Sequence, residues 1–305
     1  MATIAVYAFA CMLNGEANRY PIMVCEWLCN HWIIGTVAGL GVLLLVYKRV
    51  SGKSKKTVPK DVVLMHSFSR TSFAPSASPF ALKLETYLRM AKIPYEVDGS
   101  STFSKKSKIP WITLNDEDVT DSYFSIEHVK KHFEVDLDRK LTAEQKATAR
   151  IIEKTMEENT FWATMVQDRM FECFDECMAI YEVSYVFKLV IKYYFLRVIN
   201  KYRWGHGIGR HSSEEIRHIG AKDLRAISVL LGDKPFFMGE EPTRIDATMF
   251  AFLALLIFGM PTAAPSYKLL HSELKNLVDF VYRMKEKFWP DWDDVLLKPK
   301  EKKIN

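Results

Sequence analysis

Cysteine is scarce in this chain of 305 residues, and its few positions are clustered. The five cysteines are Cys11, Cys25, Cys29, Cys173 and Cys177. This usage excludes a disulfide-stapled fold and favours a reducing location for most of the chain. Two pairs have a C-x-x-x-C spacing that a soft metal could use. No nearby C-x-x-C or His-x-x-x-His motif supplies further ligands, so we assign no metal site and interpret the cysteines as small apolar residues.

Acidic residues are missing from residues 48–60, KRVSGKSKKTVPK, which contain six Lys or Arg. This run by itself outnumbers the formal net charge of +5, so the rest of the chain is near neutral. A general nucleic-acid surface is therefore not implied, and we expect no nucleic-acid partner. The run is interpreted as a flexible basic tether.

Charge is also missing from residues 32–47, WIIGTVAGLGVLLLVY. Such a run approaches the ~20 residues that cross ~30 Å of hydrocarbon. A secretory signal peptide is less consistent, because the basic residues follow the apolar run and no A-x-A site comes after it. We therefore predict one transmembrane helix in contact with membrane lipid. The positive-inside rule places the residues after this helix in the cytoplasm. The sequence does not indicate which organelle's membrane holds the helix.

The sequence changes character once after the tether. Residues 61–135 contain a strand, a helix, a second strand, then a hairpin and a helix, which is the order of a thioredoxin-like unit. From about Thr142 the patterns are long and amphipathic, without a strand candidate. We predict three parts: a tail, anchor and tether at 1–60, an α/β thioredoxin-like domain at 61–135, and an all-α domain at 137–305.

One helical stretch, residues 185–204 (YVFKLVIKYYFLRVINKYRW), is apolar and aromatic enough for a second membrane span to be considered. Lys188, Lys192 and Arg197 interrupt it at near-regular intervals. This spacing favours a buried helix with one wet stripe over a membrane span.

Two helix starts are marked by capping boxes. Ser212 with Glu215 follows the glycine-rich GHGIGR, which lacks the preceding strand and the Lys-Ser/Thr pair of a phosphate-binding loop. Thr243 stands three residues before Asp246 and a long apolar run. Both motifs predict the first turn of a helix.

Three segments in the same order resemble the glutathione transferase family. SPFALKLETYLRMAKIPYE matches the start of the family's first helix, with Ser78 at the reactive position. KIPW resembles the segment with a cis proline whose preceding backbone binds the cysteinyl part of glutathione, which points to Ile109 and Pro110. TDSYFSIEHV resembles the segment that holds the γ-glutamyl end, with Asp121 in place of Glu and Ser122 retained.

Within that group, PSASPFALKLETYLRMAKIPY, GIGRHSSEEI and DKPFFMGEEPTRIDATMFAFLA resemble the failed axon connections family. That family includes nematode cadmium-responsive proteins and has metaxins as cousins. The resemblance implies a membrane-anchored, glutathione transferase-like protein in stress or cadmium detoxification. Glutathione would be its substrate or ligand, with no further cofactor, and a homodimer is possible. The alternative is a non-catalytic adaptor of the same fold acting at a membrane, as in axon development or in metaxin-like roles.

The chemistry of glutathione fits the residues that the resemblance selects. Its ammonium group needs a carboxylate, which Asp121 supplies, and its carboxylates need hydroxyl or backbone donors, as at Ser122. Its thiol, with a pKa of ~8.5, must lose a proton, and a helix N-terminus favours the anion. Ser78 could donate to that thiolate, yet Ser before Pro is also a good helix cap whatever the chemistry, so both interpretations stand.

Overall fold

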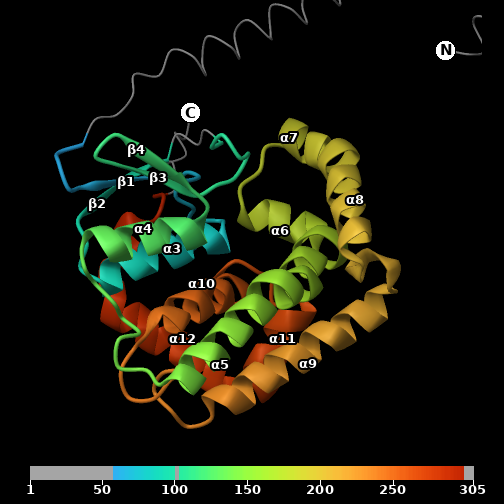
Figure 1. Ribbon diagram of the computed structural model, residues 1–305. Helices are drawn as coiled ribbons and strands as arrows, with labels where there is room; N and C mark the ends of the chain where they lie inside the picture. The colour runs from blue at the N-terminus through green and yellow to red at the C-terminus, as the bar shows by residue number, and fades with distance from the viewer. Residues whose placement is uncertain (1–57, 100–102, 299–305) are drawn as a thin grey trace, which may run out of the picture. The chain divides into compact units, whose positions relative to one another are not determined.

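Four short strands form a mixed sheet near the start of the described residues. The computed structural model describes residues 58–99 and 103–298 (Figure 1). The strands are β1 (Val63–His66), β2 (Tyr95–Asp98), β3 (Trp111–Leu114) and β4 (Glu117–Thr120). Their spatial order is β2-β1-β3-β4, with β2 parallel to β1 and the other neighbours antiparallel. Every residue of β1 is buried, as its continuous apolar sequence requires of an inner strand.

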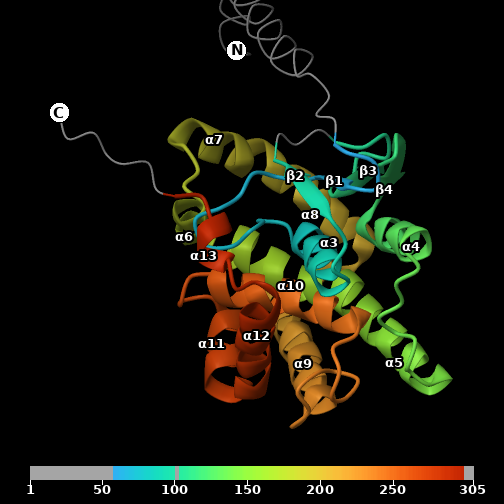
Figure 2. The ribbon, with the colours of Figure 1, turned by 90° about the vertical axis from the view of Figure 1, so that its left-hand side faces the viewer.

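Two helices complete this thioredoxin-like unit. Helix α3 (Pro79–Met90) connects β1 to β2, and α4 (Ser122–His132) follows β4. Helix α3 is buried on nearly all sides, because it packs against α4 on one side and against helices of the C-terminal part on another. The second view of the molecule shows α3 between the sheet and α10 (Figure 2).

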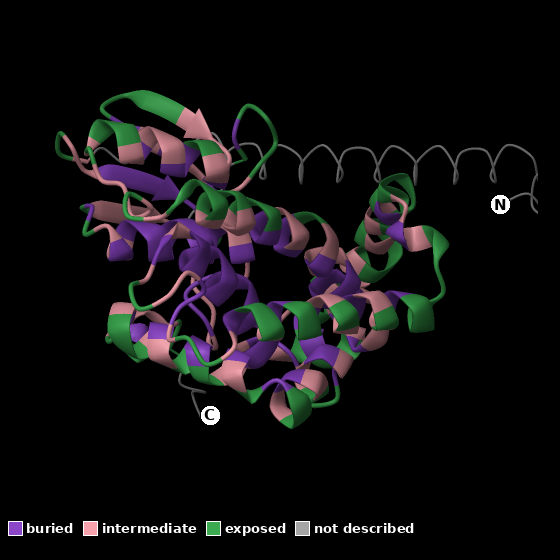
Figure 3. Cartoon of the chain, turned by 60° about the horizontal axis from the view of Figure 1, so that its bottom comes forward, coloured by how far each residue is buried: buried purple, intermediate pink, exposed green. Residues whose placement is uncertain are grey.

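The remainder of the described chain is helical. Its elements are α5 (Ala143–Lys154), the π-helical segments η1 (Thr155–Thr160), η2 (Trp162–Val166) and η3 (Asp168–Glu172), α6 (Phe174–Ile180), α7 (Tyr185–Val190), the π-helical η4 (Ile191–Phe195), α8 (Leu196–His206), the 3-10 turn η5 (Ile208–Arg210), α9 (Ser213–Leu231), α10 (Arg244–Phe258), α11 (Pro265–Glu273), α12 (Lys275–Phe288) and α13 (Trp292–Val295). Helix α10 is buried from Ile245 to Ile257 and forms the centre of this part. Buried residues gather in the interior, while the outward faces of the surrounding helices are exposed (Figure 3). The predicted boundaries at 61–135 and 137–305 stay predictions.

The transmembrane helix in the predicted fold class is not supported by the structure. Within residues 58–99 and 103–298, every helix is too short or too polar to span a bilayer. The strongly apolar helix α10 has 15 residues, about 22 Å at 1.5 Å per residue, short of the ~30 Å of hydrocarbon, and its side chains pack into the core. The predicted span at 32–47 lies outside the described residues. The glutathione transferase fold is the part of the fold prediction that the structure supports.

The prediction of a buried helix at 185–204 is wrong. Helix α7 and segment η4 bury no side chain, and α8 buries only Arg203. The lysine spacing correctly indicates a wet stripe, but the aromatic side chains on the other faces also point to solvent.

Both predicted capping boxes are confirmed. At the start of α9, the Ser212 N–H donates to the Glu215 carboxylate at 2.8 Å and the Glu215 N–H donates to Ser212 Oγ at 3.2 Å. At the start of α10, the Thr243 N–H donates to Asp246 Oδ2 at 2.7 Å. Each box satisfies backbone N–H groups that have no partner inside the helix.

Candidate functional site

Ser78 caps the first helix of the thioredoxin-like unit. It has extended backbone, Pro79 follows as the first helical residue, and Ser78 Oγ accepts a hydrogen bond from the Ala81 N–H at 3.4 Å. The side chain is half-buried. Free N–H groups of the first turn and the helix dipole both favour an anion at this end of α3. The cap is observed, and the thiolate-stabilising role of Ser78 stays a prediction.

Arg169 is a cation next to Ser78 that the sequence analysis missed. From segment η3, its guanidinium donates to the carbonyl oxygen of Ala77 at 3.3 Å and lies 4.7 Å from the centre of the Tyr181 ring. Two of its nitrogens, Nε and Nη2, are buried without a hydrogen-bond partner among the described residues. Because 92 positions separate Arg169 from Ala77, no local motif could indicate this contact.

The Ile109–Pro110 peptide bond is cis, as predicted. It immediately precedes β3, and Pro110 is buried while Ile109 is half-buried. The side chain of Lys108, the residue before Ile109, reaches Asp121 at the start of α4.

Asp121 caps α4 and holds Lys108. Its Oδ1 accepts from the Tyr123 N–H at 2.9 Å, and its Oδ2 contacts Lys108 Nζ at 2.5 Å. Burial alone would raise the pKa of Asp121, but Lys108 and the Tyr123 N–H outweigh it and hold the pKa below its usual value. The backbone φ of Asp121, 81°, lies in a region that residues other than glycine rarely adopt. Such strain is found at ligand sites.

A pocket of about 470 Å³ opens where the sheet unit meets the helical part. It brings together Asp121 and Ser122, while Ser78, Ile109 and Pro110 are not among its lining residues. The other lining residues are Phe80, Lys108, Tyr123, Phe124, Arg150, Lys154, Glu157, Glu158, Phe161 and Trp162. Aromatic rings and charges of both signs therefore share one pocket, part of whose wall is π-helical, a backbone form frequent at functional sites.

A buried ion cluster supports that wall from behind. Lys83 of α3 is fully buried, and its Nζ lies 2.6 Å from Glu153 and 2.5 Å from Glu157. Each carboxylate also has a second cation: Arg150 lies 3.0 Å from Glu153, and Lys154 lies 2.8 Å from Glu157. Since Glu157 also lines the pocket, the cluster fixes the pocket wall to the thioredoxin-like unit.

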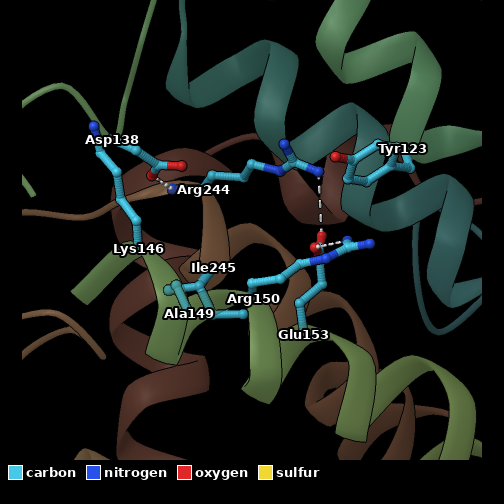
Figure 4. Close-up of a pocket in the computed structure, with 8 residues that line it drawn as sticks. All are labelled: Tyr123, Asp138, Lys146, Ala149, Arg150, Glu153, Arg244 and Ile245. Carbon is cyan, nitrogen blue, oxygen red and sulfur yellow. Dashed lines mark hydrogen bonds and ion pairs between the residues drawn. The ribbon is translucent and has the colours of Figure 1, made fainter. Parts of the chain in front are cut away.

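A smaller pocket of about 100 Å³ adjoins this cluster (Figure 4). Arg244 crosses this pocket. Its backbone N–H donates to Asp138 Oδ1 at 3.0 Å, and its guanidinium lies 3.4 Å from the Glu153 carboxylate. The guanidinium groups of Arg150 and Arg244 also lie 4.8 and 4.6 Å from the centre of the Tyr123 ring. Arg150 and Arg244 both pair with Glu153 here, so this pocket is a junction between α4, α5 and α10.

The two described cysteines are buried and unlike reactive thiols. Burial raises the pKa of both Cys173 and Cys177, the second to about 12. Among residues 58–99 and 103–298, no three His, Cys, Asp or Glu side chains are placed to hold a metal ion. The other cysteines lie outside the described residues.

Replacing Ser78 by Ala should lower the free energy of unfolding by about 0.5–2 kcal/mol through loss of the cap. The lower half of that range is expected, because the 3.4 Å bond is long. Urea unfolding measures the change, and Ser212→Ala, which removes the cap of α9, is the matched control. A loss above about 2 kcal/mol would show that Ser78 does more than cap the helix.

The mixed sheet, the cis proline before β3 and the helical C-terminal part define a glutathione transferase-like protein. Two family models match in the corresponding order: the glutathione S-transferase N-terminal domain over residues 79–171 and the C-terminal domain over residues 220–284. A glutathione S-transferase from Methylobacterium radiotolerans, solved with glutathione sulfonate, has a similar fold, with a TM-score of 0.51 and 17% identity over 78% of this chain and 96% of that one.

The chain belongs to the failed axon connections and metaxin family of glutathione transferase-like proteins. It is 34% identical to failed axon connections of Drosophila melanogaster over 80% of its own length and 62% of that protein. It is 28% identical to the isoprene-epoxide glutathione S-transferase of a Rhodococcus strain, over 70% of this chain and 94% of that one. With METAXIN, a mitochondrial outer membrane import complex protein of Arabidopsis thaliana, it shares 26% identity over 70% and 69%.

Proposed function

We propose that the chain binds glutathione in the pocket between α4 and the α5–η2 wall. The observation that carries this proposal is that Asp121 and Ser122 line one pocket together with the cations Lys108, Arg150 and Lys154. Asp121 would accept the ammonium of the γ-glutamyl group, and Ser122, at the N-terminus of α4, would donate to its carboxylate.

The ion pair with Lys108 supports this assignment chemically. The Lys108 ammonium occupies the position on Asp121 Oδ2 where the ammonium of glutathione would bind. The Lys108 side chain is 59% exposed, so its ammonium can move from Asp121 into solvent when the ammonium of glutathione replaces it. The backbone of Ile109 would then bind the cysteinyl part, and the thiol would lie toward the N-terminus of α3, near Ser78 and Arg169.

A non-catalytic adaptor is the second candidate. It is favoured by the observation that Ser78 does not line the pocket that holds Asp121 and Ser122. The relatives named above include both a transferase and an import complex protein. Roles in stress or in cadmium detoxification remain untested predictions.

Replacing Asp121 by Asn should weaken glutathione binding about 10- to 100-fold, because it removes a charge-assisted bond of about 1.5–3 kcal/mol. Isothermal titration calorimetry with glutathione measures the affinity. Asp116→Asn removes an exposed acid from the turn between β3 and β4, outside the pocket, and should leave binding unchanged. Equal affinities for wild type and Asp121→Asn would remove the proposed site. Binding without conjugation of 1-chloro-2,4-dinitrobenzene would favour the adaptor.

A further inference from the structure

Segments α7, η4 and α8, residues 185–206 and here named the arm, expose an unusual amount of aromatic surface. Tyr185 is 74% exposed and Trp204 is 60% exposed. The other exposed large apolar side chains of the arm are Val186, Phe187, Val190, Tyr193, Tyr194, Phe195 and Tyr202. The arm lies at the same end of the molecule as the sheet (Figures 1 and 2). This much exposed apolar surface on neighbouring turns of one arm indicates an interaction surface.

The charges of the arm have one sign. Between Glu182 and Glu214 the sequence has no acidic residue. Its cations include Lys188, which pairs with Asp175 at 2.8 Å, and Arg203, which is buried over the Phe171 ring at 3.9 Å.

Three further cations of the arm, Lys192, Arg197 and Lys201, are exposed among the aromatic side chains. Helices that lie in the interface of an anionic bilayer are rich in exposed Lys and Arg and also expose Trp, Phe and Tyr, which is the composition of the arm.

The arm also lies outside the matched family domains. The N-terminal family model ends at residue 171 and the C-terminal one begins at residue 220. The pocket proposed for glutathione is lined entirely by residues before 163. A function of the arm is therefore separable from the proposed glutathione site.

We propose that the arm binds peripherally to an anionic lipid bilayer. The exposed rings would enter the headgroup region, and Lys192, Arg197 and Lys201 would contact lipid phosphates and carboxylates. A second copy of the chain fits less well, because a two-fold contact would bring the same positive charges together. The arm lies on the surface of the bilayer in this proposal and does not span it.

The experiment measures co-sedimentation of the full chain with vesicles of phosphatidylcholine containing 30% phosphatidylserine. The triple variant Lys192→Gln, Arg197→Gln, Lys201→Gln should bind roughly 100-fold more weakly than wild type. The control variant Lys131→Gln, Lys222→Gln, Lys275→Gln removes the same charge from exposed sites elsewhere and should bind as wild type does. Brominated lipids should quench wild-type tryptophan fluorescence more than that of Trp204→Phe.

Four outcomes would overturn the proposal. Equal binding of the two triple variants would place the membrane contact outside the arm, and equal binding to pure phosphatidylcholine would exclude a role for charge. Equal quenching of wild type and Trp204→Phe would keep the arm out of the bilayer. A wild-type dimer that the arm triple variant converts to a monomer, with vesicle binding unchanged, would assign the arm to self-association. Glutathione titration of each variant, expected to be unchanged, tests the pocket independently.

Discussion

Replacing Lys83 by Met should lower the free energy of unfolding by about 3–5 kcal/mol, because it leaves two buried carboxylates without their shared cation. Lys83 is fully buried, and the side chains of Glu153 and Glu157 are 6% and 5% exposed. Met has similar length and fills the space, so the loss reports the charge and not a cavity. Urea denaturation followed by circular dichroism measures it, with Lys222→Met on the surface of α9 as the control.

The pH dependence gives a second measurement on the same cluster. Burial would raise the pKa of Glu153, but Lys83 and Arg244 outweigh it and lower the pKa to about 2. A carboxyl with a lowered folded-state pKa adds stability above its unfolded value of 4.5, and this stability is lost as the pH falls toward 2. Lys83→Met should flatten that part of the profile. Adding Glu153→Gln and Glu157→Gln to Lys83→Met should recover stability, because no unpaired carboxylate is then buried. A Lys83→Met variant as stable as wild type would show that the two carboxylates do not depend on Lys83.

Much of the thioredoxin-like unit could be predicted because its signals are local. The apolar run at 61–68 contains β1, and the Ser-Pro start with helical spacing predicts α3 within one or two residues at each end. The capping boxes at 212 and 243 mark true helix starts. Each of these signals acts between residues at most four apart, and tertiary packing agrees with it.

The candidate site could be predicted only in part, since its contacts join distant segments. The family motifs select Asp121 and Ser122, and the structure brings both to one pocket. Lys83 looks like a solvent-facing lysine in a helix, yet its partners are 70 and 74 positions away. Arg169 likewise contacts a residue that is distant in sequence, Ala77. The sign of a charge is visible in sequence, but its partner is set by how α3 packs on α5 and η1.

The arm shows a different limit of sequence reasoning. Its periodicity identifies a helix with polar positions, and that much is correct. Whether the apolar positions are covered depends on what packs against them, and among the described residues of the arm only Arg203 is buried. Hydrophobic patterning predicts a buried face only where a partner element exists, within the chain or outside it.

Replacing Asp246 by Ala should cost about 2–6 kcal/mol, through a different mechanism from that of Lys83. Asp246 is fully buried and accepts from the N–H groups of Phe237 at 2.8 Å and Thr243 at 2.7 Å. Without the carboxylate, two buried backbone donors lose their acceptor, at about 1–3 kcal/mol each. These bonds tie the loop before α10 to its first turn, and α10 is the centre of the helical part.

The matched control is Thr243→Val, which removes the hydroxyl that donates to Asp246 Oδ2 at 2.9 Å but keeps both N–H bonds. It should cost about 0.5–1.5 kcal/mol. The pH profile separates the mechanisms further. Burial, opposed by these hydrogen bonds, raises the pKa of Asp246 to about 6 from 3.8, so the folded state holds the proton more tightly and the contribution of Asp246 to stability should fall as the pH rises from about 4 to 6. Asp168, also raised to about 6, acts in the same window, so Asp246→Ala should remove only part of the slope. A variant that loses stability but keeps the full wild-type slope would show that Asp246 is ionised throughout that range and that burial does not govern its pKa.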